Sequence, residues 1–366
     1  MALSEVPYIR WAKYEGLMGR HRLTASAVPP VEWSDIGLDP GSLALTEYSP
    51  YGPEEVFQRL NSDWGLDPDG IVLGASASHA HFCFAASMVP QGGTVVHESP
   101  GYLPLLDALS LLGVRKVPIQ RRFEENYRLD IAELQQKIEA EKADLVLLTH
   151  LHNPSGVSLG EEEITGLVEV VEKTGCPVII DEMYRPFLDP DPGPICLRHP
   201  KIVSVWGLNK VHGLSQVRFG WGCGSPQLAD QARRIFDSTT LHTSCLTDQV
   251  ARVAMDHLDV LAARGRRISR RGWTQFSEWL KNHDLPLVEP SGGLICFPRI
   301  PSSVARDGDH FRELCMEHDL NVTPGRFFGE PNHVRIGFGA PEEELKVSLK
   351  ILGEILDAGR GSTFGA

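Results

Sequence analysis

The sequence is poor in the features that mark secreted, membrane-spanning or metal-stapled proteins. Its seven cysteines are scattered, and no two are spaced like a zinc knuckle or a CxxC redox pair. Dispersed cysteines of this kind are typical of small buried side chains in a reducing compartment. No apolar run approaches the roughly 20 residues of a membrane span, and the first residues lack the apolar core of a signal peptide. We therefore expect a cytoplasmic protein with no membrane partner and no metal site.

A surplus of positive charge is missing as well. The chain has 35 Lys and Arg residues against 48 Asp and Glu, a formal net charge of −13. Because the phosphates of nucleic acids require a basic surface, this balance argues against a nucleic-acid partner. Small anionic ligands stay compatible with it, since a few local arginines can hold them. The GxGxxG fingerprint is also absent, which argues against a nucleotide-binding oxidoreductase.

Short β-rich runs alternate with amphipathic stretches over the first two thirds of the chain. Such alternation is typical of βαβ units and predicts an α/β fold with a mostly parallel sheet flanked by helices. The expected strands are residues 71–73, 94–97, 114–119, 144–149, 177–181, 202–206 and 218–223. Expected helices between them include residues 131–140 and 161–174.

Beyond about residue 225 the pattern changes to that of a smaller α+β domain. Long helices are expected over residues 227–283, with periodic apolar positions in 250–261 and 273–280. Strands at 294–298, 321–324 and 333–338 and a helix at 342–358 follow. With 366 residues, the chain exceeds one ordinary domain of about 100–200 residues. We divide it into an irregular N-terminal segment (1–40) packing on the small domain, a large domain (41–260) and the small domain (261–366).

A turn of small residues follows the first expected strand. It contains Ser76, Ala77 and Ser78 and leads into a helical pattern. Backbone N–H groups at a helix start, with two serine hydroxyls beside them, form an anion-binding site. A tight turn with an N-cap serine explains the same residues without a ligand.

Polar residues follow two further expected strands. Asn153 comes after the apolar run 145–148, at the end of a strand where α/β sheets bind ligands, although a plain Asn-Pro turn also explains it. Asp181 ends a buried β run, where a carboxylate is costly without a cation or hydrogen-bond donors. A pyridinium nitrogen would be such a partner, and a helix N-cap is the alternative. Tyr184 lies three residues further, within reach of the same ligand.

Lys210 lies in a glycine-rich stretch with few other charges. Apolar surroundings lower the pKa of a lysine and make its amine available as a nucleophile. Arg218 follows eight residues later and opens another β run, where it is suited to a dianionic phosphate. A surface lysine and a structural arginine fit less well, because the flanking sequence is not that of a solvated face.

Taken in order, these segments resemble the class I/II aminotransferases of the aspartate aminotransferase superfamily, which are fold type I pyridoxal-phosphate (PLP) enzymes. The shared motifs are an Asn-Pro-x-Gly turn, an Asp-x-x-Tyr strand end, a lysine in a glycine-rich loop and an arginine eight residues beyond. The resemblance runs from about Leu23 to Leu352. It implies pyridoxal 5'-phosphate as the cofactor, bound by the large domain.

The resemblance also implies a role for each motif residue. Lys210 would form a Schiff base with PLP and then act as general acid and base. Asp181 would pair with the pyridine nitrogen and strengthen the ring as an electron sink. Asn153 and Tyr184 would bond the phenolic oxygen of the ring. The phosphate would be held by Ser76, Ala77, Ser78 and Arg218.

Further residues match the family outside these motifs. Tyr102 resembles the aromatic residue that stacks on the cofactor ring, although a half-buried core tyrosine explains it too. Tyr48 resembles the tyrosine that reaches the phosphate of the neighbouring subunit, with Tyr51 as the competing candidate. Arg335, with Asn153, would hold the substrate α-carboxylate, because a planar guanidinium pairs both oxygens at once. Without the resemblance, Arg335 would be interpreted as a strand-edge surface residue.

Some positions depart from the family pattern. Gly207 and Asn209 stand where serines are usual, so a hydroxyl contact to the phosphate is expected to be lost. His79, His81 and His152 crowd the cofactor segments, and three neutral packed histidines explain them without a role in chemistry. The strip 23–29 resembles the one that lines the substrate pocket, but it offers no charge partner for a substrate side chain.

The resemblance leads to one principal function and one alternative. The principal function is transfer of an amino group between an amino acid and a 2-oxo acid through a Lys210 Schiff base. The same machinery serves lyases and cyclases of specialised biosynthetic pathways, which form the alternative. A regulator with an aminotransferase-like domain is disfavoured, since no basic DNA-binding extension precedes the domain. Because Tyr48 would serve a neighbour's cofactor, we expect a homodimer with shared active sites.

Overall fold

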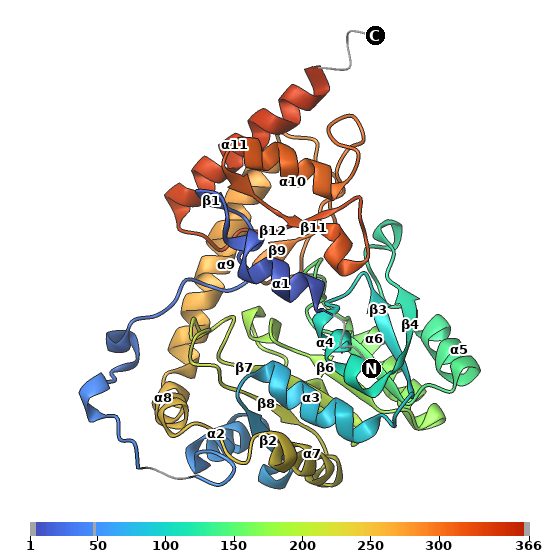
Figure 1. Cartoon of the computed structure of the whole chain (residues 1–366), viewed down its shortest axis with the longest axis vertical. Helices are drawn as coiled ribbons and strands as arrows, with labels where there is room; N and C mark the ends of the chain where they lie inside the picture. The colour runs from blue at the N-terminus through green and yellow to red at the C-terminus, as the bar shows by residue number, and fades with distance from the viewer. Residues whose placement is uncertain (1–4, 47–48, 362–366) are drawn as a thin grey trace.

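The computed structural model describes residues 5–46 and 49–361 and is built around a seven-stranded sheet of order β2-β8-β7-β6-β5-β3-β4 (Figure 1). Its strands are β2 (Ile71–Gly74), β3 (Thr94–Ser99), β4 (Arg115–Gln120), β5 (Leu145–Thr149), β6 (Val178–Asp181), β7 (Ile202–Gly207) and β8 (Gly220–Cys223). All neighbours pair in parallel except β8, which runs antiparallel to β2 and β7. The fold is therefore the predicted α/β architecture with a mostly parallel sheet.

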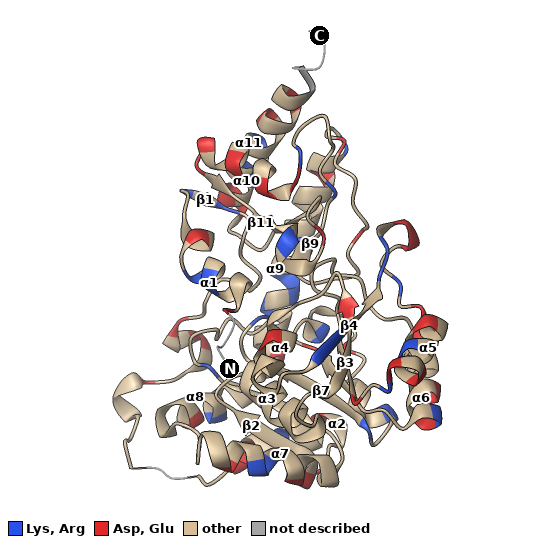
Figure 2. Cartoon of the chain, turned by 45° about the vertical axis from the view of Figure 1, so that its right-hand side comes forward, with Lys and Arg blue, Asp and Glu red and all other residues tan. Residues whose placement is uncertain are grey.

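Helices cover both faces of this sheet, as parallel strands require. They are α2 (Glu54–Trp64), α3 (Ala77–Met88), α4 (Pro104–Asp107), α5 (Ile131–Glu141), α6 (Glu161–Thr174), α7 (Pro226–Thr239) and α8 (Cys245–Met255). Helix α3 packs against β7, β8 and α7 and has no charged residue other than histidine. Figure 2 shows it without Lys, Arg, Asp or Glu, whereas the outer helices α5 and α6 carry both signs of charge. Helix α3 is thus an internal element that links the sheet to the helical layer.

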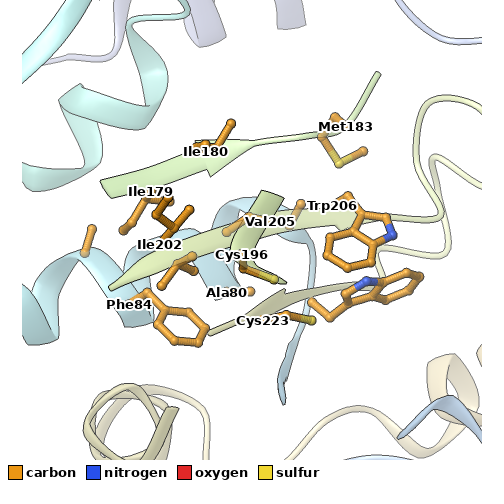
Figure 3. Close-up of a cluster of buried hydrophobic side chains, with 14 of the residues drawn as sticks. Ala80, Phe84, Ile179, Ile180, Met183, Cys196, Ile202, Val205, Trp206 and Cys223 are labelled. Atoms are coloured by element: carbon orange, nitrogen blue, oxygen red, sulfur yellow. The ribbon is translucent and has the colours of Figure 1, made fainter. Parts of the chain in front are cut away.

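The main core lies on both faces of the sheet, and α3 covers part of it. Ile179 and Ile180 of β6, Val205 and Trp206 of β7 and Phe84 of α3 are all buried there (Figure 3). Consecutive residues of one strand are buried on opposite faces because helices cover both of them. This packing holds the carboxyl ends of β5, β6 and β7 in a rigid row.

A second, smaller part follows the sheet domain. Its elements are α9 (Leu258–Leu280), β9 (Ile295–Cys296), α10 (Gly308–Glu317), β10 (Leu320–Asn321), β11 (Thr323–Pro324), β12 (Val334–Gly337) and α11 (Glu342–Gly361). Strands β11, β12 and β9 form an antiparallel sheet over a separate core that contains Phe276 and Phe311. Helix α9 joins both parts, since Leu261 belongs to the first core and Phe276 to the second. The boundary at residue 261 falls within this shared helix and stays a proposal.

The N-terminal segment crosses over both parts (Figure 1). Strand β1 (His21–Arg22) pairs in parallel with β10 of the small part. An irregular segment was expected here. That expectation is wrong for residues Pro7–Lys13, which precede β1 and form helix α1. Pro7 suits the first helical position, and Tyr8 and Trp11 bury one side of this helix.

Other expected elements differ from the structure as well. The strand predicted over residues 321–324 is divided into β10 and β11, which belong to different sheets. The helix predicted over residues 250–261 is broken at Asp256 and His257 into α8 and α9. Met255 and Leu258 face the same core on either side of the break, so the apolar pattern continues across it. The strand predicted from Arg218 begins at Gly220, because Arg218 has a left-handed backbone with φ of 57°. None of the helices within residues 5–46 and 49–361 combines the length and apolar character needed to cross a membrane.

Candidate active site

A cavity of about 670 Å³ lies at the carboxyl ends of β5 and β6, beneath helix α1. Most of the predicted site residues line it: Ser76, Ala77, Ser78, Tyr102, Asn153, Asp181, Tyr184, Lys210 and Arg218. They come from segments spread over more than 140 positions of the sequence. Ligand sites of α/β sheets are expected at this edge, where the loops after successive strands meet.

Lys210 lies three residues beyond the end of β7. Its Nζ donates a hydrogen bond to Ser26 Oγ at 2.9 Å. Burial lowers the pKa of Lys210 to about 8, and the positive charge of Arg335 acts in the same direction against the opposing effect of Asp181. A substantial fraction of this amine is therefore neutral near physiological pH and able to attack a carbonyl carbon.

Asp181 ends β6 in the middle of the sheet. Its Oδ1 accepts a hydrogen bond from the Met183 N–H at 3.0 Å. Burial raises the pKa of Asp181 to about 6, although the Met183 N–H and Lys210 both oppose the shift. A buried carboxylate with so little compensation favours a positively charged partner, and a protonated pyridine nitrogen has that property.

Asn153 and Tyr184 are held by the loops after β5 and β6. The Asn153 N–H donates to Thr149 Oγ1 at 2.8 Å, which anchors the Asn-Pro turn to the strand end. Tyr184 Oη donates to the Ser26 carbonyl oxygen at 3.0 Å. Burial raises the pKa of Tyr184 to about 12, so that its phenol stays a neutral hydrogen-bond donor.

The start of α3 forms one end of the cavity. Ser76 is the N-cap residue, and its hydroxyl accepts from the His79 N–H at 3.3 Å. Ala77 and Ser78 begin the helix, whose free N–H groups and dipole favour an anion. Arg218 lines the same cavity from the loop before β8. This end combines backbone donors, hydroxyls and a guanidinium, as a phosphate group requires.

The structure explains why two residues of this site depart from the family pattern. A side chain at Gly207 would meet Gly220 Cα at 2.6 Å, so the strand pair has no room for a serine there. When its amide is oriented to satisfy its neighbours, Asn209 accepts from Arg218 Nη1 at 2.9 Å. Ser215, which lines the cavity, brings a hydroxyl from elsewhere in the loop.

The three histidines of these segments are packed. His81 lines the cavity, but its Nε2 bonds the Leu105 carbonyl at 3.0 Å and burial lowers its pKa to about 4. His152 bonds Ser155 Oγ at 2.6 Å and the Pro100 carbonyl at 2.8 Å. Burial of the His79 ring lowers its pKa as well. These contacts agree with the interpretation of the three histidines as packed, neutral side chains.

Arg335 lies on β12 of the small part, and its side chain is 1% exposed. It is the predicted site residue that the small part contributes. Its Nη1 donates to Asn153 Oδ1 at 3.1 Å and its Nη2 to Tyr8 Oη at 2.7 Å. The Tyr102 ring meets the Tyr8 ring edge-on, with centroids 5.6 Å apart. Arg335 is thus a buried cation directed at Asn153, as expected of a residue that holds a carboxylate.

Sequence reasoning missed several lining residues, among them Tyr8, Ser26 and Ser215. Ser26 lies in the strip 23–29, so the region was expected but not the residue. Tyr8 precedes every motif, and nothing in its local sequence indicates a ligand. Tyr48 lies outside the described residues, while Tyr51 is 43% exposed with its Oη 3.3 Å from Asp237 Oδ2.

Residues 44–352 match the protein family described as aminotransferase class I and II. The chain belongs to this family. Its members use pyridoxal 5'-phosphate, and the enzyme is a PLP-dependent aminotransferase by this membership.

Individual relatives are distant but cover most of the chain. The capreomycidine synthase of Streptomyces vinaceus is 28% identical, with 97% of this chain and 94% of that protein covered. Histidinol-phosphate aminotransferase 2 of Haemophilus influenzae strain Rd is 24% identical over 82% of this chain and 80% of its own length. These relatives carry names of different activities, so they leave the substrate open.

Solved structures share the fold. A PLP-dependent aminotransferase from Streptococcus suis superposes with a TM-score of 0.90 and 22% identity, covering 98% of this chain and 99% of its own. Aspartate aminotransferase from Thermus thermophilus with maleate gives a TM-score of 0.84 at 19% identity, with 96% and 95% covered. At these identities the likeness establishes the architecture alone.

Proposed function

We propose that Lys210 is the residue to which this aminotransferase attaches its cofactor and which moves the proton in transfer between an amino acid and a 2-oxo acid. The observation that carries the proposal is that Lys210 and Asp181 line one cavity, while the buried Arg335 is bonded to Asn153, another residue of its lining. An amine with a lowered pKa, a carboxylate and a buried guanidinium are thus brought close together, and each has a separate task.

The residues present fit pyridoxal 5'-phosphate. Asp181 would face the ring nitrogen, and Tyr102 would cover the ring face. Asn153 and Tyr184 would donate to the phenolic oxygen. The phosphate would be held by Ser76, Ala77, Ser78, Arg218 and the α3 N-terminus. When bound, this cofactor supplies a carbonyl carbon for amines and a ring that accepts electron density from the substrate Cα.

The protein's own groups then perform the acid–base work. The Lys210 amine would remove the proton from the substrate Cα, and its protonated form would act as the general acid. Its lowered pKa keeps it available as a base near neutral pH. Arg335 pairs with the substrate α-carboxylate, and Asn153 keeps the guanidinium oriented. Holding the carboxylate in this way fixes which Cα bond faces Lys210.

A lyase or cyclase activity is the second candidate. It is favoured by one specific observation, the match to a capreomycidine synthase over 97% of the chain. The residues described above would serve either outcome, because both begin with removal of the Cα proton. The products distinguish the two.

The assembly and the compartment are also proposed. We infer a homodimer, which large exposed apolar side chains at Trp33, Leu45 and Leu241 support. A reducing, cytoplasmic location is supported by seven cysteines that are all free and mostly buried.

Absorption spectroscopy of the purified protein with added PLP tests the proposal. We expect a visible band that disappears in Lys210→Ala. Amino acids from a panel should convert it to the pyridoxamine-phosphate spectrum, with a 2-oxo acid as product. If ammonia or a cyclic product appears instead while the original band persists, the second candidate replaces the first. A protein that shows no band after reconstitution would contradict both.

A further inference from the structure

Helix α1 covers the substrate side of the cavity, yet it lies outside the region 44–352 that matches the family. Tyr8 is its most buried contact with the site, 9% exposed. The Tyr8 ring is fixed by aromatic neighbours on several sides. Its centroid lies 5.6 Å from those of Tyr102 and Phe328 and 5.8 Å from that of Phe327. A tyrosine held this firmly presents its hydroxyl at a defined point.

The Tyr8 hydroxyl lies at the guanidinium of Arg335. Tyr8 Oη accepts a hydrogen bond from Arg335 Nη2 at 2.7 Å, while Nη1 is occupied by Asn153. Tyr8 thereby uses an oxygen lone pair and keeps its own proton. Among the described residues, no acceptor for that proton is found. The hydroxyl therefore has a hydrogen-bond donor to offer to a ligand in the cavity.

A carboxylate that pairs with Arg335 enters next to this donor. Two carboxylate oxygens provide about four acceptor positions, more than one guanidinium edge can use. The Tyr8 hydroxyl can supply a further donor without adding charge to a site near Arg335 and Lys210. Tyr8 is only 9% exposed, so such a bond is stronger than it would be at the surface.

We propose that Tyr8 is a positioning residue for the substrate α-carboxylate. Its hydroxyl donates to one carboxylate oxygen while Arg335 pairs with the carboxylate. The inference rests on the proposed function, since it takes Arg335 as the carboxylate site. It assigns part of substrate recognition to a segment that the family match does not include.

A pair of small aminooxy compounds tests this without knowledge of the natural substrate. Aminooxyacetate and methoxyamine both react with lysine-bound PLP, their nitrogen replacing Lys210 Nζ on the cofactor carbon to give an oxime. Only aminooxyacetate carries a carboxylate. The ratio of their second-order rate constants, followed by absorbance in the PLP-loaded enzyme, therefore measures recognition of the carboxylate alone.

In Tyr8→Phe, which keeps the ring, we expect this ratio to fall about tenfold or more, as for loss of a hydrogen bond to a charged group. Tyr14→Phe is the matched control, because Tyr14 is 71% exposed on the same segment, and it should leave the ratio unchanged. Arg335→Lys should lower the ratio as well. Adding Tyr8→Phe to it should then have a smaller effect than in the wild-type enzyme.

The outcomes are separable. An unchanged ratio in Tyr8→Phe overturns the inference. So does an equal fall in both rate constants, which would mean that Tyr8 only supports the packing of the site. Failure of methoxyamine to react with the wild-type enzyme would instead contradict the proposed role of Lys210. Circular dichroism of each variant shows whether it has the native fold.

Discussion

The side chain of Lys210 stays in surroundings that disfavour its charged form. Its pKa is lowered from 10.5 to about 8 by burial, with the charge of Arg335 contributing. Below pH 8 the Lys210 amine is protonated in both the folded and the unfolded chain, and the folded state bears the full free-energy cost of burying this charge. Above 10.5 neither is charged and the penalty vanishes.

Replacement of Lys210 should therefore stabilise the cofactor-free protein. We expect Lys210→Met to raise the free energy of unfolding at neutral pH by about 1–3 kcal/mol. The gain should shrink as the pH rises from 8 toward 10.5. Urea unfolding of the wild-type protein and of Lys210→Met, at neutral and at alkaline pH, measures this difference in free energy of unfolding. A gain of the same size at both pH values would contradict burial of charge as the cause.

The same lowered pKa predicts how the protein captures its cofactor. Only the neutral amine attacks the PLP carbonyl, so the capture rate should rise with pH and level off above about 8. Stopped-flow absorbance of cofactor-free protein mixed with PLP measures this profile. Nα-acetyl-lysine is the control for titration of PLP itself, and its rate should keep rising to about pH 10. Parallel profiles for the two amines would show that Lys210 has an ordinary pKa.

Some residues of the site could be predicted from the sequence, and others could not. Asp181 and Lys210 stood out because a charged residue in an apolar run is costly to bury unless it has a partner. Tyr8 and Ser215 gave no such signal, since a tyrosine or serine is unremarkable at its position in the sequence. Their places in the cavity depend on contacts between distant segments, which no local pattern encodes.

Between elements, the contact of β8 with the start of α3 is unusually close. A side chain at Gly220 would meet the Ala77 backbone nitrogen at 2.3 Å. The absence of a side chain lets the strand support the turn that would hold the cofactor phosphate. Any larger residue must move Ala77 and its neighbours away from the sheet.

Gly220→Ala should therefore weaken PLP binding by about tenfold or more, in addition to a loss of roughly 1–3 kcal/mol of stability. Equilibrium titration of the cofactor-free variant with PLP, read by absorbance, measures the first effect. Gly272→Ala is the matched control, since its side chain would meet the Phe338 carbonyl oxygen at 2.0 Å, away from α3. It should destabilise the fold but leave PLP affinity nearly unchanged. Equal losses of affinity in both variants would contradict a local effect on the phosphate site.

Secondary structure was predictable where amphipathic pattern and helix ends agree. Helix α6 has the predicted bounds, with Gly160 before it and Gly175 in a left-handed conformation after it. The break between α8 and α9 was not predictable, because apolar residues on both sides of it face one core. Periodicity reports which side of an element is buried, not where the chain changes direction.

For the molecule as a whole, the sequence indicated a large sheet domain and a smaller α+β part, and both are present. It did not indicate that helix α9 would carry side chains into both cores. It also did not reveal that helix α1 would lie over the cavity, because long-range packing of a short helix leaves no periodic trace.

Assembly is the remaining property at this scale. If Tyr48 reaches a neighbour's cofactor, sedimentation should give twice the mass of one chain. Tyr48→Phe should then bind PLP more weakly, by about threefold to tenfold for one hydrogen bond, while the assembly stays intact. Tyr51→Phe is the control, since the Tyr51 hydroxyl lies near Asp237. A larger loss in Tyr51→Phe would transfer the role to that residue, and a monomer that turns over substrate would contradict shared sites.

The hydrogen bond from Arg335 to Tyr8 joins the opening segment of the chain to the small part across the cavity. Helix α1 therefore takes part in the site although the motif residues all come later in the sequence. Mutations in helix α1 can therefore change how firmly any amino acid is held, because every amino acid presents an α-carboxylate to Arg335.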